Sequence, residues 1–466
     1  MLFGSVAFLK FIVLTVAAYW MAPRRHRWLV LLCSSLAFYA TFLAPLLLVV
    51  LGLVSTVTWY VTCAIQQNPD EKAQRRLLFL SIGFILILLF GVRLLAHFGV
   101  WSGRFPGWVR LGSTIGLSYF CLQAIGYLVD TYLGRMSPER KWGHVLLSLA
   151  FFPKIAQGPI ERGARLLPQL HALETPAYPM LRSALLLFAW GLFKKSVLAD
   201  RLQTLVDPVF ASSEVFSGLA SLLAVYAYAF QLYFDFSGYT DMARGCARFF
   251  GIELTENFKA PYLATSVSDF WRRWHISFSR WLLDYLFMPL QLSWRRAGVW
   301  GTAIALLITF ALSGLWHGAS SCFMVWGLLH GCYLAIGSLR SRGRKAAQAQ
   351  PGKARTVLRV VVTFHLVAFA WIFFRADSLA NATRVLGSFT HSTQGLHRLL
   401  TMGGPRAVYV TLLACVCYGA IERTRGGNLW QVAQRTFVLR WTAYFLLCGA
   451  ILILGQPASG YIYFQF

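Results

Sequence analysis

The chain has 466 residues, of which 57% are hydrophobic and only 13% are charged. Soluble domains carry about 25% charged residues, so a water-soluble fold could not bury this much apolar side chain. Lys and Arg outnumber Asp and Glu by 43 to 17, which gives a net charge of +26. Such an excess would suggest nucleic-acid binding in a soluble protein. Here the cations lie in short connectors between apolar runs, as in the cytoplasmic loops of membrane proteins, so we expect no nucleic-acid partner.

Long apolar runs fill most of the sequence. A membrane-spanning helix needs about 20 mostly apolar residues, and about a dozen runs approach this length. The runs lie at residues 2–20, 29–44, 46–65, 77–96, 111–130, 180–197, 216–234, 299–316, 320–338, 357–374, 407–421 and 438–455. We therefore predict an all-α integral membrane protein with about 11–13 transmembrane helices. No soluble domain or internal repeat interrupts the runs, so residues 1–466 are predicted to form a single membrane domain.

The cationic connectors predict the orientation of the chain. Arg24, Arg25 and Arg27 follow the first run, and the positive-inside rule places their loop in the cytoplasm. The amino terminus and the loop 97–110 are then predicted to face the periplasm, although Arg104 and Arg110 in that loop partly contradict this.

Two segments are not predicted to span the membrane. Residues 145–160 contain Pro153, Gly158 and Pro159, so they are predicted to form re-entrant or interfacial pieces. Residues 341–355 form a short basic linker that is predicted to be cytoplasmic.

The stretch from Phe270 to Pro289 has the pattern of an amphipathic helix. Its aromatic residues, among them Trp274, would share one face, while Arg272, His275 and Ser279 would share another. An interfacial anchor explains most of these residues, with tryptophans at the headgroup level and snorkelling arginines. His275 is the exception, because an anchor has no particular need for an imidazole.

A second histidine ends an apolar run. His317 lies between Gly314 and Gly318, where helix backbones can approach closely, and Trp326 and His330 follow. A lone histidine on an apolar helix is more often structural, but the Trp-His-Gly setting favours a functional role. No zinc site is expected, because residues 317 and 330 would lie on roughly opposite faces of a continuous helix and no His-Glu-x-x-His motif is present.

Two acidic residues, Asp235 and Asp241, closely follow an apolar run. Burial of a carboxylate is costly unless it has a partner. These side chains could orient a histidine, or they could pair with Arg244 and Arg248, and the sequence does not decide between the two.

Together these motifs resemble the membrane-bound O-acyltransferase (MBOAT) superfamily. Within it they are most similar to the membrane subunits that O-acetylate exported bacterial polysaccharides such as alginate. The resemblance rests on Tyr233–Asp241, Asn257–Tyr262, Phe270–Ser277, Trp316–Gly318, Tyr461–Phe466 and the opening Met1-Leu2-Phe3. It implies a ring of helices around a central funnel in the bacterial inner membrane. It also implies acyl transfer from a cytoplasmic donor to an extracytoplasmic acceptor.

The resemblance gives His317 and His275 catalytic roles. A buried neutral imidazole at residue 317 could accept the proton of a hydroxyl that attacks a thioester. His275 would orient His317 or polarise the acyl carbonyl. Further supporting or substrate-binding residues are expected to be Asn257, Asp269, Asp235, Trp316 and His330.

The resemblance also implies the substrates and partners. Acetyl-CoA is the expected donor, with no bound cofactor and no metal, and Lys194 and Lys195 could hold its phosphates, although snorkelling explains these lysines equally well. A periplasmic acetyltransferase partner, an exopolysaccharide acceptor such as alginate or cellulose, and membrane lipids complete the expected partners. D-alanyl or other acyl transfer to a cell-wall polymer is the alternative within the family. A polytopic transporter is the alternative from another class, and the absence of a visible inverted repeat counts against it.

Overall fold

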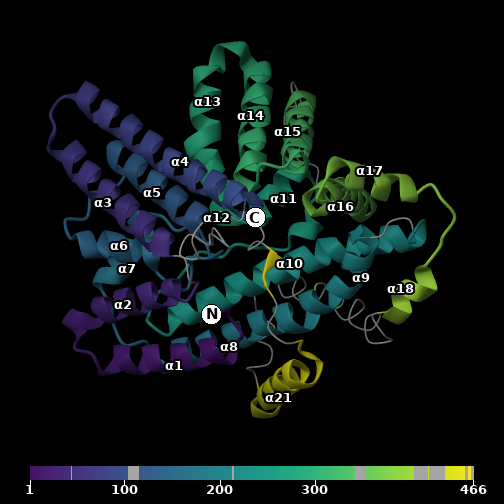
Figure 1. Ribbon diagram of the computed structural model, residues 1–466, viewed down its shortest axis with the longest axis horizontal. Coiled ribbons are helices and arrows are strands. Elements are labelled where there is room, and N and C mark those ends of the chain that lie inside the picture. The colour runs from purple at the N-terminus through teal and green to yellow at the C-terminus, as the bar shows by residue number, and fades with distance from the viewer. Residues whose placement is uncertain are drawn as a thin grey trace. The chain divides into compact units, whose positions relative to one another are not determined.

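The computed structural model describes residues 1–42, 45–102, 115–211, 215–341, 352–402, 418, 436–456 and 460–462. Within these ranges the regular secondary structure is helical, apart from one antiparallel bridge between Ser217 and Gln394 (Figure 1). Several predictions lie wholly or mostly outside the described residues. They concern the run 407–421, the linker 341–355, most of the loop 97–110 and the last residues of the motif 461–466.

The chain forms two compact units. Unit 1 comprises Met1–Leu192, Tyr239–Glu256 and Gly460–Phe466, and unit 2 comprises Phe193–Gly238 and Asn257–Ser459. Helix α10 contributes residues to both units. The helices of unit 1 are α1 Val6–Met21, α2 Arg27–Ala40, α3 Pro45–Gln67, α4 Glu71–Ser102, α5 Leu117–Tyr132, α6 Trp142–Ala150, α7 Gly163–His171 and α8 Tyr178–Phe193, which ends one residue beyond the unit. The helices of unit 2 are α9 Asp200–Ala211, α10 Leu219–Arg248, α11 Val267–Arg273, α12 Ile276–Leu282, α13 Met288–Ser293, α14 Gly298–His317, α15 Ser321–Ser341, α16 Lys353–Arg375, α17 Leu379–Ser388, α18 Leu396–Met402 and α21 Phe437–Leu454.

Seven helices in the described part of the chain are long and apolar enough to cross a membrane: α3, α4, α10, α14, α15, α16 and α21. Each matches a predicted run, which confirms an all-α, multi-pass membrane protein. The shorter apolar helix α1 matches another. The described parts of the predicted runs at 29–44 and 111–130 contain α2 and α5, which have 14 and 16 residues.

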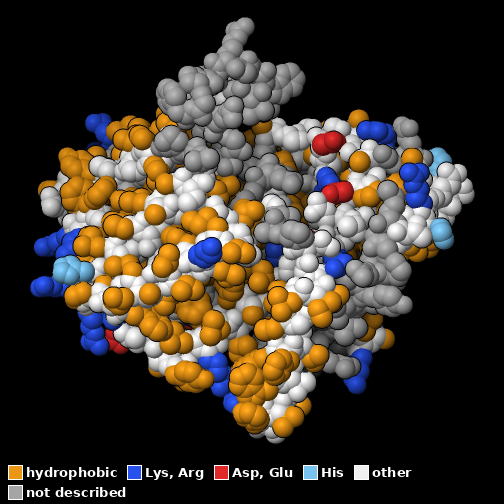
Figure 2. Space-filling model, turned by 60° about the horizontal axis from the view of Figure 1, so that its bottom comes forward, with side chains coloured by type: hydrophobic (Ala, Val, Ile, Leu, Met, Phe, Trp, Pro, Cys, Tyr) orange, Lys and Arg blue, Asp and Glu red, His pale blue; other side chains and the backbone are white. Residues whose placement is uncertain are grey.

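Apolar side chains cover much of the surface. Figure 2 shows one face, on which hydrophobic side chains form broad patches while Lys and Arg side chains gather mainly toward its margins. Helix α21 alone exposes Phe445, Leu452 and Ile453 by 73%, 84% and 79%. Water-soluble monomers rarely present such continuous apolar patches, so these side chains are suited to contact with lipid.

The segment after α6 is buried without being helical. Residues 151–162 contain turns instead of a continued helix, as the prediction for 145–160 required. The backbone N–H of Phe152 donates to the Ser35 hydroxyl at 3.1 Å, and the fully buried Lys154 ammonium donates to the Gln123 side chain. Burial lowers the pKa of Lys154 to about 7, because desolvation disfavours the charged amine.

Helices α14 and α15 pack against each other through glycines (Figure 1). A Cβ atom at Gly314 would lie 2.4 Å from the carbonyl oxygen of Phe323, and one at Gly327 would lie 2.2 Å from that of Phe310. Any larger residue would force the backbones apart, so the close approach predicted at Gly314 is confirmed. This packing fixes the end of α14, where His317 lies.

Candidate active site

The predicted amphipathic helix is broken at Trp274 and His275. Helix α11 ends at Arg273 and α12 begins at Ile276, so the prediction of one continuous helix is wrong. His275 lies between them in the left-handed region, with φ 43° and ψ 55°. Few residues with a bulky side chain adopt this conformation, and it persists only where the surroundings hold it.

Asn257 holds the chain at this break. Its backbone carbonyl accepts a hydrogen bond from the N–H of Ile276 at 3.0 Å, and its side-chain oxygen accepts one from the N–H of Ser277, also at 3.0 Å. The first turn of α12 is therefore capped by a residue from another segment, because the N-cap residue His275 forms no side-chain cap of its own. These tertiary hydrogen bonds outweigh the helical pattern of the local sequence.

The break turns the aromatic residues inward. Trp271, Trp274 and Trp281 are buried, at 7%, 1% and 6% exposure. The prediction that these tryptophans anchor the segment at the headgroup level is therefore wrong, because protein side chains surround them.

The His275 ring is buried in an aromatic setting. The side chain is 1% exposed, and its ring meets Phe236 edge-on at 4.7 Å between centroids and lies 5.1 Å from Phe278. Desolvation lowers the pKa of His275 to about 3. The imidazole is therefore neutral at physiological pH and carries one N–H donor and one acceptor nitrogen.

His317 is also enclosed by aromatic rings. It is 4% exposed at the end of α14, and the rings of Trp326 and Phe374 meet it edge-on at 5.0 and 5.1 Å. Phe278 contacts both histidines, with its ring 6.0 Å from His317 and 5.1 Å from His275. One aromatic side chain thus joins the two predicted catalytic residues.

Two further predicted residues belong to the same cluster. Trp316 stacks on Phe278 at 4.5 Å between centroids. The Nδ1 atom of His330 accepts a hydrogen bond from the Trp271 indole at 3.2 Å, and its ring lies 5.3 Å from Trp326. Because Trp326 also contacts His317, the structure brings both predicted residues into the surroundings of the histidine pair.

Comparison with known proteins gives consistent matches. A model of the MBOAT, membrane-bound O-acyltransferase family, matches residues 146–376. A probable alginate O-acetylase, AlgI, of Pseudomonas putida is 34% identical over an alignment of 496 positions that covers 100% of both chains. A peptidoglycan O-acetyltransferase of Helicobacter pylori is 31% identical and covers 94% of this chain and 91% of its own. A teichoic acid D-alanyltransferase of Bacillus subtilis is 29% identical over 57% of this chain and 69% of its own.

A relative that is 34% identical and aligns over the whole of both chains is enough to show the family. The chain belongs to the membrane-bound O-acyltransferase family. It is therefore a multi-pass membrane enzyme that transfers acyl groups to oxygen, and the alternative of a transporter is set aside. The predicted ring of helices around a funnel stays a prediction.

Asp269 of this O-acyltransferase has a structural setting. One carboxylate oxygen accepts the backbone N–H of Thr265 at 3.1 Å, and the other accepts the Arg273 guanidinium at 2.9 Å. The Ser266 hydroxyl in turn accepts the N–H of Asp269 at 3.1 Å. This reciprocal cap fixes the start of α11, and through it the segment that leads to His275.

Asp235 pairs with Lys195, whereas the partners considered from the sequence were a histidine, Arg244 and Arg248. Its carboxylate lies 2.7 Å from the Lys195 ammonium, which also lies 2.7 Å from Asp200. All three side chains are buried. Lys195 is therefore held by two carboxylates, and it neither snorkels nor lies open to the phosphates of a donor.

Lys194 is buried as well and lies over the Tyr233 ring, 5.9 Å from its centroid. Cation–π contact with this ring replaces the predicted snorkelling.

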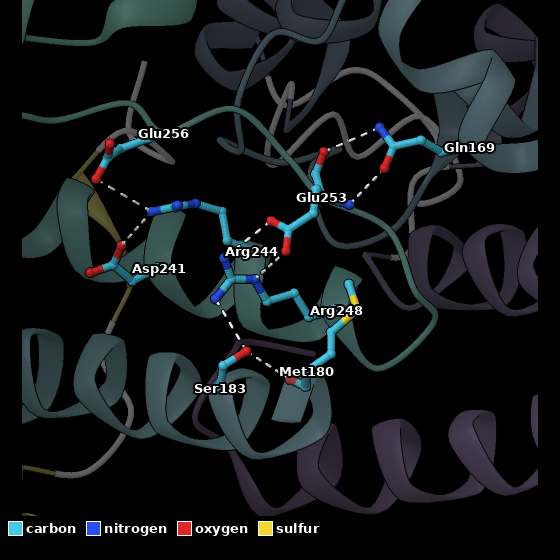
Figure 3. A network of polar contacts seen from close by, with 8 residues as sticks. All are labelled: Gln169, Met180, Ser183, Asp241, Arg244, Arg248, Glu253 and Glu256. Atoms are coloured by element: carbon cyan, nitrogen blue, oxygen red, sulfur yellow. Dashed lines mark hydrogen bonds and ion pairs between the residues drawn. The ribbon is translucent and has the colours of Figure 1, made fainter. Parts of the chain in front are cut away.

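Asp241 follows the second of the two predicted alternatives. Figure 3 shows its carboxylate next to Arg244, at 3.7 Å, while Glu256 lies 3.8 Å from the same guanidinium. Arg248, the other arginine proposed as a partner, pairs with Glu253 at 2.9 Å. The cluster belongs to unit 1 and serves to hold that unit together.

Proposed function

We propose that this O-acyltransferase moves acetyl groups from cytoplasmic acetyl-CoA across the bacterial inner membrane for O-acetylation of an exported polysaccharide such as alginate or cellulose. One observation carries the proposal: two buried histidines, His275 and His317, share the Phe278 ring in a chain that matches an alginate O-acetylase over its whole length.

In the proposed reaction His317 is the general base. Its neutral imidazole takes the proton of the acceptor hydroxyl as that oxygen forms a bond to the thioester carbonyl carbon. The tetrahedral intermediate then collapses, the carbon–sulfur bond breaks, and the imidazolium returns its proton to the departing thiolate. Thiolates leave more readily than alkoxides, so one positioned base meets the demand for proton transfer. The aromatic rings around His317 keep water from the reacting thioester.

His275 polarises the acyl carbonyl in this proposal. A histidine with a pKa of about 3 stays neutral throughout the physiological range, so it serves as a fixed N–H donor and not as a proton carrier. A donor aimed at the developing oxyanion acts most strongly where water is excluded. Asn257 supports it by fixing the break in the chain that presents the ring.

Trp316, His330, Asp269 and Asp235 act through packing and backbone placement. The acceptor hydroxyl belongs either to a periplasmic acetyltransferase partner or to the glycan itself. Transfer of D-alanine to a cell-wall polymer is the second candidate, which the match to a teichoic acid D-alanyltransferase over 57% of the chain supports less strongly.

A donor-specificity assay tests the proposal. Purified protein in proteoliposomes is given acetyl-CoA labelled in its acetyl group or, separately, D-alanine thioesterified to a carrier protein. We expect loss of the thioester from acetyl-CoA in wild type and a loss of rate of at least roughly 10²-fold in His317→Ala. Use of the D-alanyl donor in preference to acetyl-CoA would support D-alanine transfer instead. Equal rates for wild type and His317→Ala would overturn the role of His317.

A further inference from the structure

Three metal-ligating side chains meet in unit 1, outside the candidate active site. Glu139 lies in the connection between α5 and α6, His144 lies in α6, and His171 is the last residue of α7. One ligand atom from each lies within 4.8 Å of the other two. Nε2 of His171 is 2.6 Å from Oε2 of Glu139, and Nδ1 of His144 is 3.7 Å from the same oxygen.

The surrounding contacts hold two of these side chains in place. His144 is 6% exposed, and the Trp28 ring meets it edge-on at 5.0 Å between centroids. A Cβ atom at Gly143 would lie 2.7 Å from the Trp28 ring, so glycine at that position permits this contact. The second oxygen of Glu139 accepts the backbone N–H of Lys141 at 2.8 Å. This hydrogen bond to Oε1 leaves Oε2 turned toward the imidazoles of His144 and His171.

The His144 ring carries a buried nitrogen that calls for a ligand. Nδ1 is buried and forms no hydrogen bond with any described residue, and the nearby Glu139 oxygen at 3.7 Å is beyond hydrogen-bond distance. Buried polar atoms without a partner are uncommon in native proteins and require an explanation. Desolvation lowers the pKa of His144, because burial disfavours the charged ring.

We propose that Glu139, His144 and His171 bind a divalent transition-metal ion, with Zn²⁺ as the best match. Two imidazole nitrogens and one carboxylate oxygen are ligands that zinc accepts, and tetrahedral geometry at about 2.0–2.1 Å separates neighbouring ligand atoms by roughly 3.3 Å. The separations of 2.6 and 3.7 Å lie on either side of that value, so small side-chain rotations would form the site. Three protein ligands leave a fourth position for water.

The ion would join three elements of unit 1, because its ligands come from a connection and two helices. The alternative is a simple ion pair of the Glu139 carboxylate with the His171 imidazole, whose side chain is 49% exposed. The positive charge of Lys141 disfavours a charged imidazole at residue 144 and any bound cation alike, so it does not decide between the two. A metal ion would bring the buried His144 nitrogen into bonding contact, whereas the ion pair leaves it 3.7 Å from the Glu139 oxygen.

Metal analysis of the intact protein distinguishes a metal site from a simple ion pair. Protein purified without a polyhistidine tag is stripped with chelator, incubated with ZnCl₂, desalted and measured for zinc and for Tm. We expect about one Zn²⁺ per wild-type chain, a Tm that rises with Zn²⁺, and a visible spectrum of low-symmetry Co²⁺ after substitution with cobalt.

His171→Gln is the informative variant, because its half-exposed side chain can be replaced without disturbing the core. His397→Gln, at an exposed histidine elsewhere, is the matched control. We expect a loss of Zn²⁺ affinity of roughly tenfold or more in the first and no change in the second. Absence of bound zinc in wild type, or equal binding by His171→Gln, would overturn the site and leave the ion pair. Neither result would bear on acetyl transfer by the histidine pair in unit 2.

Discussion

The side-chain oxygen of Asn257 caps the helix that begins beside His275, through a 3.0 Å hydrogen bond from the backbone N–H of Ser277. This bond and its companion to Ile276 hold His275 in a left-handed conformation and present its buried ring to Phe278. We therefore propose Asn257 as a positioning residue for the candidate active site.

Replacing Asn257 should reduce activity by moving His275. Asn257→Ala removes the cap, for which we expect a loss of about 1–2 kcal/mol in stability together with a fall in acyl transfer. Thermal unfolding and transfer rate, measured on the same purified samples, check this. Asn257→Asp keeps the acceptor oxygen and should recover much of the stability. If Asn257→Ala unfolds at a lower temperature yet transfers acyl groups at the normal rate, Asn257 does not position His275.

The His275 imidazole should be needed for chemistry. Gln can donate a hydrogen bond but does not reproduce the ring geometry, so His275→Gln is expected to lose roughly 10²- to 10⁴-fold in transfer rate. Arg280→Gln, at an exposed position of α12, is the control and should remain active. Both are assayed at matched membrane abundance. Near-native activity of His275→Gln would show that His317 works without this partner.

His275→Gly distinguishes a chemical role from a structural one. Glycine adopts the left-handed conformation freely, so backbone strain falls even though the ring is lost. We expect a folded, inserted protein with activity as low as that of His275→Gln. A variant that fails to accumulate in membranes would show that the ring is needed mainly for packing against Phe236 and Phe278.

The buried Lys195 should be essential for folding. Its ammonium lies between Asp200 and Asp235, and Lys195→Met would leave two buried carboxylates without their cation. Breaking a buried ion pair from one side costs about 3–5 kcal/mol, so we expect strongly reduced membrane abundance. Asp235→Asn should cost less, because Lys195 keeps Asp200. Normal abundance of Lys195→Met, measured by immunoblot of washed membranes, would contradict this arrangement.

The pKa of Lys154 predicts a pH effect on stability. The folded protein holds this amine at a pKa of about 7, against 10.5 for an unperturbed lysine, so between these values the unfolded chain binds more protons. Stability should therefore rise as pH increases from 7 toward 10, by up to about 1.4 kcal/mol per pH unit. Lys154→Met should lack this component of the rise. Parallel Tm curves for wild type and Lys154→Met across that range would show that Lys154 is not neutralised by burial.

The sequence predicted the parts of the fold that depend on hydropathy. Apolar runs of spanning length can be recognised directly, and Gly314 indicated the close packing of α14 on α15 that places His317. His275 and His317 stood out in the sequence because ionisable side chains beside apolar segments are costly, and their catalytic roles stay predictions.

Sequence was insufficient where distant segments decide the local structure. Helical periodicity runs unbroken through Trp274 and His275, and the sequence does not reveal the hydrogen bonds that Asn257 accepts where the helix stops. The partner of Asp235 was missed for the same reason, since Lys195 lies 40 positions away and resembles a snorkelling lysine.

If His317 is the base for acetyl transfer to an exported polysaccharide, its loss must change the acetyl content of that polymer. A strain whose sole copy carries His317→Ala is compared with wild type after immunoblots confirm equal protein in the membrane. We expect that the polymer is still exported but that its O-acetyl groups are lost. Normal acetyl content in that strain would contradict it.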